Sequence, residues 1–231
     1  MKLVNSVLVG LAATGVLAAA VPAQATPDFI TAYGWVTTEA IVNSATGASA
    51  ASLALGTCHN GAGACTHANA DVTFTTTGVG FNTTDSTIAA WLASTAFPLN
   101  GVVDSQPGHL MDATIWEFVG NGSFFGTPGT PQSFTIQHDD GSTFVVNGQT
   151  VINQPGPTPP VTTTGSYTGG AGGSLPFDLI YSECCGGPAV LATSLLGPSA
   201  APAPEPASLV LLGTGLVGAG VRRWRKRRNA A

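Results

Sequence analysis

The sequence predicts an all-β protein: an antiparallel β-sandwich with one short helix, followed by a single hydrophobic helix near the C-terminus. Two observations predict the sandwich. Glycine and proline number 30 and 16 among the 231 residues, which favours turns and short strands over long helices. Between those turn residues, short segments alternate polar with apolar positions and are rich in β-branched and aromatic side chains, as the strands of a sandwich are.

The segments with this alternation are predicted to be strands. They are 71–76, 113–119, 133–137, 142–146, 149–153, 161–167, 175–182 and 189–195. Asn147 and Gly148 separate two of them and are typical of a two-residue hairpin turn. In the segment 175–182, every second residue from Leu175 to Tyr181 is apolar or aromatic. We expect that face of the strand to point into the core.

One segment of the body, 87–96, has a helical pattern, and Asp85 or Ser86 is available to cap its N-terminus. The Pro-rich and Gly-rich stretches at 155–160 and 169–173 are short enough to be loops within one fold. Residues 26–199 are therefore predicted to form a single β-sandwich domain.

The charge of the chain is unevenly distributed. The seven cations are Lys2 and six residues between Arg222 and Arg228, so residues 3–221 contain neither lysine nor arginine. This distribution argues against a nucleic-acid partner, because affinity for nucleic acid comes from Lys and Arg on phosphates. It also leaves the carboxylates of the body without a protein cation, so metal ions become their expected counter-charges.

The N-terminal residues 1–25 are predicted to be a secretory signal peptide. A single lysine precedes an apolar run, and Ala23-Gln24-Ala25 is a small-x-small cleavage site. An uncleaved N-terminal anchor is the alternative, but the run is rich in small residues and ends at Val21-Pro22. The body is therefore expected to be exported.

The C-terminal residues have three parts in a fixed order. A Pro/Ala linker at 200–206 ends in Pro204-Glu205-Pro206, and residues 207–231 contain an apolar stretch, 208–221, and an arginine-rich tail. The apolar stretch is about 21 Å long as a helix, so it is just long enough to span a membrane if the arginines snorkel. The tail, beginning with Arg222 and Arg223, is expected to stay cytoplasmic.

This C-terminal arrangement resembles the PEP-CTERM sorting signal. The resemblance covers 204–231 and implies that a membrane exosortase recognises the signal and cleaves near Pro204-Glu205-Pro206. It further implies an exported protein of a Gram-negative bacterium that makes exopolysaccharide and lives in biofilms. The protein would be anchored transiently in the inner membrane and then reach the cell surface, outer envelope or extracellular matrix.

Within the body, residues 134–196 resemble the protective-antigen domain family, a β-sandwich module of bacterial toxins, glycosidases, flocculins and other adhesins. The matching pattern is an apolar strand, Asp-Asp-Gly, then Asn-Gly and an apolar pair, and later Tyr-x-Glu with a terminal leucine. The residues on this pattern are Asp139, Asp140, Gly141, Asn147, Gly148, Val151, Ile152, Tyr181, Glu183 and Leu191. Residues 183–189 depart from the usual ending by about one position.

In the lectin branch of that family the paired aspartates bind calcium, which in turn holds sugar hydroxyls, and a cis peptide joins the two aspartates. The resemblance therefore implies that Asp139 and Asp140 bind Ca²⁺, and that these two residues and Asn147 bind the ligand. Ca²⁺ takes six to eight hard oxygens, of which two carboxylates supply a part. The extra oxygens would come from among Asn153, Asp178 and Glu183. The alternative is that Asp-Asp-Gly is only a turn whose carboxylates cap backbone N–H groups.

The four cysteines of this exported chain are expected to form two disulfides. We predict Cys58–Cys65, which flank a short Gly/Ala loop, and Cys184–Cys185, a pair of neighbours; four cysteines also allow two other pairings. A zinc site made of the first pair with His59 and His67 is the alternative. Disulfide formation is favoured in an oxidising compartment.

The sequence favours a non-catalytic protein. Neighbouring aspartates on a strand end point apart, unlike the two carboxylates that face a bound sugar in a glycosidase, and no nucleophile elbow, zinc-protease helix or phosphate loop occurs. The leading hypothesis is a calcium-dependent module that binds an extracellular glycan or exopolysaccharide. A structural protein of the envelope or matrix is the second hypothesis, and a carbohydrate-active enzyme is the third. Trp35, Trp116 and Tyr167 are candidates for stacking on a sugar, or for core packing.

Overall fold

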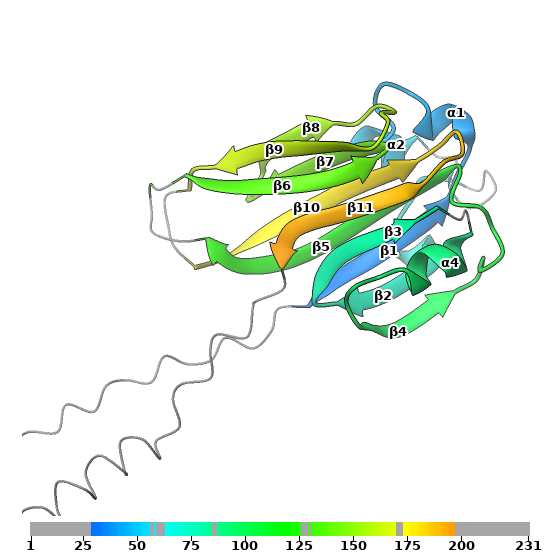
Figure 1. The fold of residues 1–231 in the computed structure, drawn as a ribbon, viewed down its shortest axis with the longest axis horizontal. Coiled ribbons are helices and arrows are strands. Elements are labelled where there is room, and N and C mark those ends of the chain that lie inside the picture. Colours follow the sequence, from blue (N-terminus) through cyan, green and yellow to red (C-terminus); the bar gives the residue numbers. More distant parts are fainter. Residues whose placement is uncertain are drawn as a thin grey trace, which may run out of the picture. The chain divides into compact units, whose positions relative to one another are not determined.

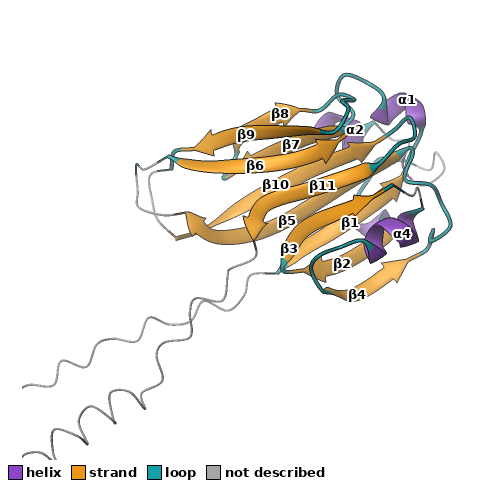
Figure 2. Ribbon diagram, in the orientation of Figure 1, coloured by secondary structure: helices purple, strands orange, loops and turns teal. Residues whose placement is uncertain are grey.

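Two antiparallel sheets face each other in the computed structural model, which describes residues 29–55, 58, 63–84, 87–125, 129, 131–169 and 173–196 (Figures 1 and 2). The larger sheet has the order β4 (Leu99–Asp104), β2 (Val72–Thr76), β1 (Ile30–Val36), β5 (Thr114–Phe125), β10 (Gly173–Glu183), β7 (Gly141–Val146) and β8 (Gln149–Gln154). The smaller sheet has the order β3 (Gly78–Thr83), β11 (Ala189–Leu196), β6 (Gln132–Asp139) and β9 (Val161–Tyr167). The predicted all-β sandwich is confirmed.

Every predicted strand segment overlaps a strand of the structure, but β1, β3 and β4 were not predicted. Glycines within these strands hid them, because glycine in a strand pattern indicates a turn or a bulge. In β1 the glycine has a packing role: a Cβ on Gly34 would overlap the ring of Trp116. In β4 the pair Asn100-Gly101 has the composition of a turn, and Gly101 has a φ of 63°.

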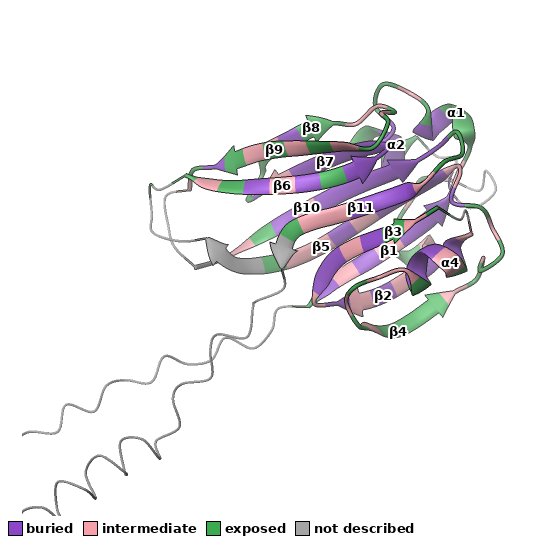
Figure 3. Cartoon of the chain, in the orientation of Figure 1, coloured by how far each residue is buried: buried purple, intermediate pink, exposed green. Residues whose placement is uncertain are grey.

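The main core lies between the two sheets. Phe177, Leu179 and Tyr181 of β10 are buried in it, and Leu175 packs against it, as the alternation predicted. The helix α4 (Ile88–Ala93) contributes Trp91, whose ring stacks on that of Tyr181 with centroids 6.0 Å apart. The strand β7 is buried along most of its length, whereas the edge strand β4 is largely exposed (Figure 3).

A second core lies on the outer face of the larger sheet. Trp35, Ile115 and Ile180 project from β1, β5 and β10 and are covered by the segment that carries α1 (Glu39–Val42) and α2 (Ala50–Ala54). The 3₁₀ turn η1 (His67–Asn69) ends this segment. The segment with α1 and α2 covers only part of the outer face, so the rest of that face stays open.

Four short helical elements lie in the described part of the chain, where the sequence predicted one. The predicted helix 87–96 is observed as α4, and its cap is Thr87, whose Oγ1 accepts a hydrogen bond from the Ala90 N–H at 3.2 Å. The proposed caps Asp85 and Ser86 lie outside the described residues. The elements α1, α2 and η1 are too short to give a periodic pattern.

The two ends of the chain lie outside the described residues. This applies to the predicted signal peptide 1–25, the linker 200–206 and the helix and tail at 207–231. Among the helices that the structure does describe, none has the length and apolar character needed to cross a bilayer.

The predicted hairpin is present between β7 and β8. Asn147 and Gly148 have φ values of 47° and 78°, the left-handed conformations that a two-residue turn of this kind requires. Val146 pairs with Gln149 across the turn, and the Asn147 N–H donates to the Pro176 carbonyl oxygen at 2.8 Å. This hydrogen bond holds the turn against β10.

Candidate functional site

The paired aspartates lie where the chain crosses from one sheet to the other. Asp139 is the last residue of β6 in the smaller sheet, and Gly141 is the first residue of β7 in the larger sheet. The peptide bond between Asp139 and Asp140 is cis, the conformation that the resemblance to the lectins implied. The end of β10 and the start of β11 reach the same end of the sandwich, since Ser182 pairs with Gly141 and Val190 pairs with Asp139 (Figure 1).

Asp140 is a buried carboxylate whose two oxygens both accept backbone hydrogen bonds. The Cys184 N–H donates to Oδ2 at 2.8 Å, and the Thr158 N–H donates to Oδ1 at 3.2 Å. The Thr158 hydroxyl also donates to the Asp140 carbonyl oxygen at 2.8 Å. Asp140 therefore joins the loop after β8 to the end of β10, which is the role that the turn alternative assigned to it.

Asp139 has a different environment. The residue is only 6% exposed, yet no residue that the structure describes donates a hydrogen bond to its carboxylate. Burial, and next the neighbouring charge of Asp140, raise its pKa to about 6. The carboxylate of Asp139 thus lacks the protein donors that stabilise that of Asp140.

Glu183 and Tyr181 complete a buried chain of hydrogen bonds behind Asp139. The Tyr181 hydroxyl lies 2.5 Å from Glu183 Oε2 and also contacts the Asp139 carbonyl oxygen. The Tyr181 hydroxyl has one proton to donate, and the Asp139 carbonyl oxygen can only accept it. The contact between Tyr181 and Glu183 therefore takes its proton from the Glu183 carboxyl group. Burial raises the pKa of Glu183 to about 9; the hydrogen bond with Tyr181 lowers it, and the charges of Asp140, Asp139 and Asp112 raise it further. Glu183 is therefore protonated at neutral pH.

His138 supports the aspartates from within the smaller sheet. It is fully buried, its Nδ1 lies 2.6 Å from the Asp140 carbonyl oxygen, and its Nε2 lies 2.9 Å from Thr163 Oγ1. The carbonyl needs a donor, so Nδ1 carries the proton and Nε2 accepts from the threonine hydroxyl. Burial lowers the pKa of His138, with an opposing contribution from the Asp140 hydrogen bond. The histidine is neutral and structural.

Gly141 follows the aspartates for a steric reason. A Cβ at this position would overlap the Pro155 carbonyl oxygen and would lie 2.8 Å from Ser182 Oγ. The same Pro155 oxygen accepts a hydrogen bond from the Ala48 N–H at 2.7 Å. Only glycine lets the loop after β8 pass directly over the start of β7.

Asp112, Asp139, Asp140 and Glu183 are named here the acidic corner. Asp112, just before β5, raises the pKa of both Asp140 and Glu183 by its charge, and its Oδ1 accepts from the Gly186 N–H at 3.0 Å. The largest cause of the raised pKa of Asp140 is burial. Residues 3–221 carry no lysine or arginine, so no protein cation from the body balances this charge.

The sequence predicted only part of this group. Asp139 and Asp140 were found because they are adjacent, and Glu183 because of the Tyr-x-Glu pattern. Asp112 was missed, since nothing in the residues around it marks it as a partner of a motif that follows it in the chain. Its position before β5, which lies between β1 and β10, could only be recognised from the sheet order.

Three other predicted oxygen donors do not join the corner. Asn147 lies in the hairpin turn at the other end of β7 from the aspartates, where its Nδ2 donates to the Tyr167 hydroxyl at 3.4 Å. Asn153 is exposed on β8 opposite Thr143. Asp178 lies mid-strand on β10, where its charge interacts with those of Glu117 and His67.

The three aromatic residues considered for stacking are all buried. Trp35 and Trp116 are at most 1% exposed, and Tyr167 is 6% exposed. The Trp116 indole N–H donates to Thr114 Oγ1 at 3.0 Å, within the core between the sheets. The core-packing interpretation is therefore confirmed for all three residues.

The cysteines are joined as Cys58–Cys65 and Cys184–Cys185, with Cα atoms 5.1 and 3.8 Å apart. The first pair closes the loop after α2, and the Cys65 N–H donates to the Leu53 carbonyl oxygen at 2.8 Å. The zinc alternative loses both of its thiols to this bond. His67 is engaged elsewhere, 2.6 Å from Glu117 Oε2, and His59 lies outside the described residues.

The acidic corner offers an incomplete set of metal ligands. In the described part of the chain no three His, Cys, Asp or Glu side chains are grouped closely enough to hold a metal ion. The donor set is nevertheless suited to a hard cation, because it consists of carboxylate oxygens and contains an Asp139 side chain with no protein donor. A calcium ion bound at this corner would therefore need carbonyl oxygens or water to complete its coordination shell.

The comparisons with known proteins identify the C-terminal segment. A family model described as the PEP-CTERM protein-sorting motif matches residues 202–228. The chain carries a PEP-CTERM sorting signal. This signal indicates export and sorting to the cell surface in bacteria, and it implies processing by an exosortase. No curated protein matches the chain.

The solved structures address the body of this PEP-CTERM protein. A PA14 sugar-binding domain from an RTX adhesin is 20% identical with a TM-score of 0.51, over 73% of this chain and 89% of that one. The PA14 domain of the MpAFP antifreeze protein is 19% identical with a TM-score of 0.49, over 74% and 83%. PA14 is the protective-antigen domain whose pattern residues 134–196 resemble, and the first of these likenesses confirms the predicted fold.

Proposed function

We propose that this protein is a non-catalytic surface module that binds a saccharide through calcium held at the acidic corner. The observation that carries the proposal is Asp139, a residue only 6% exposed whose carboxylate lies beside other acids and receives no hydrogen bond from the described residues. The carboxylate oxygens still reach solvent, since neither is among the buried atoms without a partner, so a cation from solution can approach them. A bound Ca²⁺ would offset the repulsion between Asp139 and Asp140, because it supplies the missing positive charge.

Asp139 and Asp140 would hold the ion, and Ca²⁺ bound there would supply a positive centre for sugar hydroxyls. The carboxylates must be ionised to bind it, and the raised pKa of Asp139, about 6, leaves that group ionised above neutral pH. Glu183, which is protonated at neutral pH, holds the Tyr181 hydroxyl against the backbone of Asp139 and so positions it. The exposed Gly186 and Gly187 beside the corner leave room for a ligand.

The sorting signal is consistent with this role. Its exosortase would release the protein from a transient anchor in the inner membrane of a Gram-negative bacterium, and the module would then act in the envelope or the biofilm matrix. An extracellular glycan or exopolysaccharide is the ligand that such a place provides. The sugar-binding name of the adhesin domain that shares the fold supports the same ligand class.

A structural matrix protein is the second candidate function, and one observation favours it. Both oxygens of Asp140 already accept backbone hydrogen bonds, as expected if the motif served only as a turn. An enzyme is disfavoured, because Asp139 and Asp140 are neighbours in the chain and Glu183 is held in a buried hydrogen bond, so these three acids do not form a pair that faces across an open site.

The test is a thermal melt of the full-length protein, oxidised, in EDTA and in millimolar Ca²⁺. Calcium at a hundred times its dissociation constant should stabilise the fold by about 2.7 kcal/mol. Asp139→Asn should abolish this shift, whereas Glu39→Gln, at an exposed acid on α1, should retain it. A calcium-dependent shift would be followed by a glycan array in the two buffers. Identical wild-type melts in EDTA and calcium would overturn the proposal and favour the structural alternative.

A further inference from the structure

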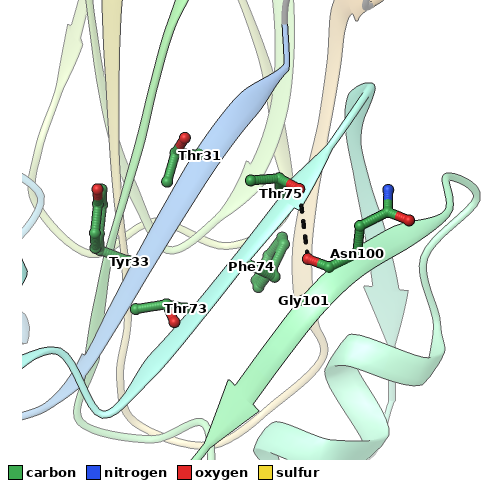
Figure 4. A pocket seen from close by; sticks show the side chains of 7 residues that line it. All are labelled: Thr31, Tyr33, Thr73, Phe74, Thr75, Asn100 and Gly101. Atoms are coloured by element: carbon green, nitrogen blue, oxygen red, sulfur yellow. Dashed lines mark hydrogen bonds between the residues drawn. The ribbon is translucent and has the colours of Figure 1, made fainter.

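An open groove of about 540 Å³ lies on the outer face of the larger sheet, away from the acidic corner. Its sides come from β1, β2 and β4, on the part of the face that the segment with α1 and α2 leaves uncovered. Figure 4 shows Tyr33 at one end of the groove and Asn100 at the other, with threonine side chains between them. The lining residues are Thr31, Tyr33, Thr73, Phe74, Thr75, Asn100 and Gly101, and we name this site the outer-face groove.

The lining of the groove carries no charge, and hydroxyl and amide groups are set in a surface that is more apolar than polar. Thr31 pairs with Thr75, and Tyr33 pairs with Thr73, so their side chains form two adjacent rows on one face. Asn100 continues the rows on β4, opposite Thr75. Neighbouring strands are about 4.8 Å apart, so the floor across these three strands is roughly 10 Å wide. The groove therefore offers apolar surface with hydroxyl and amide groups spaced across it, over an area larger than a single small ligand group.

Tyr33 is held as a fixed aromatic wall. Its ring is stacked on His67, with centroids 3.8 Å apart and planes at 6°. His67 is itself held by Glu117, whose Oε2 lies 2.6 Å from His67 Nε2. In Figure 4 the Tyr33 side chain stands beside Thr31 and Thr73. The side chain is half-buried, so binding at the groove costs little additional ordering of the ring.

We propose that the outer-face groove is a second ligand site, which binds a neutral saccharide without calcium. A pyranose has a C–H face that packs on an aromatic ring and a rim of hydroxyls that both donate and accept hydrogen bonds. The groove provides a matching pair of features: the Tyr33 wall, and the donors and acceptors of three threonines and one asparagine. The lining contains no carboxylate to hold a calcium ion, so binding here needs no calcium.

The charge of the surroundings selects against acidic sugars. The carboxylate nearest to the Tyr33 wall along the sheet is Glu117, its partner on β5, and residues 3–221 contain no lysine or arginine. A uronate would therefore meet the Glu117 carboxylate, which is already paired with His67, and no lysine or arginine. This site goes beyond the calcium-dependent function proposed above, and it shares no residue with the acidic corner.

The test is calorimetric titration of the full-length protein with cellohexaose, laminarihexaose and maltohexaose, all in EDTA, with an alginate oligosaccharide as the acidic comparison. We expect one or more neutral hexasaccharides to bind and the alginate not to bind. Tyr33→Ala should weaken binding by about tenfold, the loss of one stacked ring. Thr31→Val with Thr73→Val should also weaken it, and this pair preserves side-chain volume and strand propensity if Tyr33→Ala fails to fold.

The matched control is Thr162→Val with Thr164→Val, at two exposed positions of β9 in the other sheet. This control and Asp139→Asn should leave binding in EDTA unchanged, which separates the groove from the calcium site. The proposal is overturned if no neutral hexasaccharide binds in EDTA. It is equally overturned if alginate binds as well as they do, or if the groove variants bind like the β9 control.

Discussion

The acidic corner and the outer-face groove are opposite kinds of surface on one sandwich. The corner is buried, charged and made of side chains that repel one another, and its hydrogen bonds run mainly to the backbone. The groove is open, uncharged and made of side chains that project from neighbouring strands. The difference shows that a site can be specified either by a chain crossing between sheets or by the flat face of one sheet.

The difference also determines what a substitution does at each place. At the corner the same residues hold the fold and form the candidate site, so a change there alters stability. In the groove the threonines rest on an already formed sheet, so an isosteric change alters only the surface. The following predictions order these effects from large to small.

The largest effect is expected for Gly141→Ala. The added methyl group would overlap the Pro155 carbonyl oxygen, and overpacking against backbone costs about 3 kcal/mol. Urea unfolding should show a lower midpoint for this variant. Gly108→Ala is the control, because a Cβ at Gly108 meets nothing within 4 Å, and it should unfold like the wild type. Equal midpoints for Gly141→Ala and the wild type would show that the loop after β8 can move aside.

A smaller effect should separate the two aspartates when both are measured in EDTA. Asp140→Asn places an amide NH₂ against the backbone N–H of Cys184 or Thr158, and losing one such hydrogen bond in a buried place costs about 1–3 kcal/mol. Asp139→Asn removes a charge that has no donor, so its free energy of unfolding should stay within about 0.5 kcal/mol of wild type or exceed it. The opposite order in urea melts would contradict the assigned roles.

The smallest effect concerns pH and the outer face. Burial, and next the charge of Glu117, raise the pKa of Asp178 to about 7, while His67 lowers it. The folded state thus holds this proton more tightly than the unfolded state, and stability falls as pH rises from about 4 to about 7. After solvent screening the loss is on the order of 1 kcal/mol.

Asp178→Asn should remove this part of the pH dependence and leave the rest. Urea melts across the same pH range would measure it, with Glu39→Gln as the control at an exposed acid. A wild-type slope that persists unchanged in Asp178→Asn would assign the pH dependence to other carboxylates.

The sequence predicted those features that depend on local order. The alternation on β10, the Asn147-Gly148 turn and the adjacency of Asp139 and Asp140 are all properties of short segments, and the structure contains each of them. The sequence could not place Asn147 relative to the aspartates, because the distance between them depends on the direction in which β7 runs from the crossing between the sheets.

The outer-face groove could not be predicted at all. It needs β1 and β4, the strands that their glycines concealed, and it needs their order around β2. Asp112 was missed for the same reason, since sheet order alone brings it to a motif far along the chain. Features made by pairing between distant strands leave no pattern in a single sequence.

The directions of β1 and β11 determine where the two ends of the described domain lie. Val190, near the start of the strand, pairs with Asp139, and the strand then runs away from the corner to Leu196, roughly 20 Å further on. β1 has the matching polarity, since Val36 and Glu183 both pair with Thr114 and Ile30 lies at the far end. The first and last strands of the described domain therefore have their outer ends, Ile30 and Leu196, at the end opposite the aspartates, so neither of these strand ends lies beside the acidic corner.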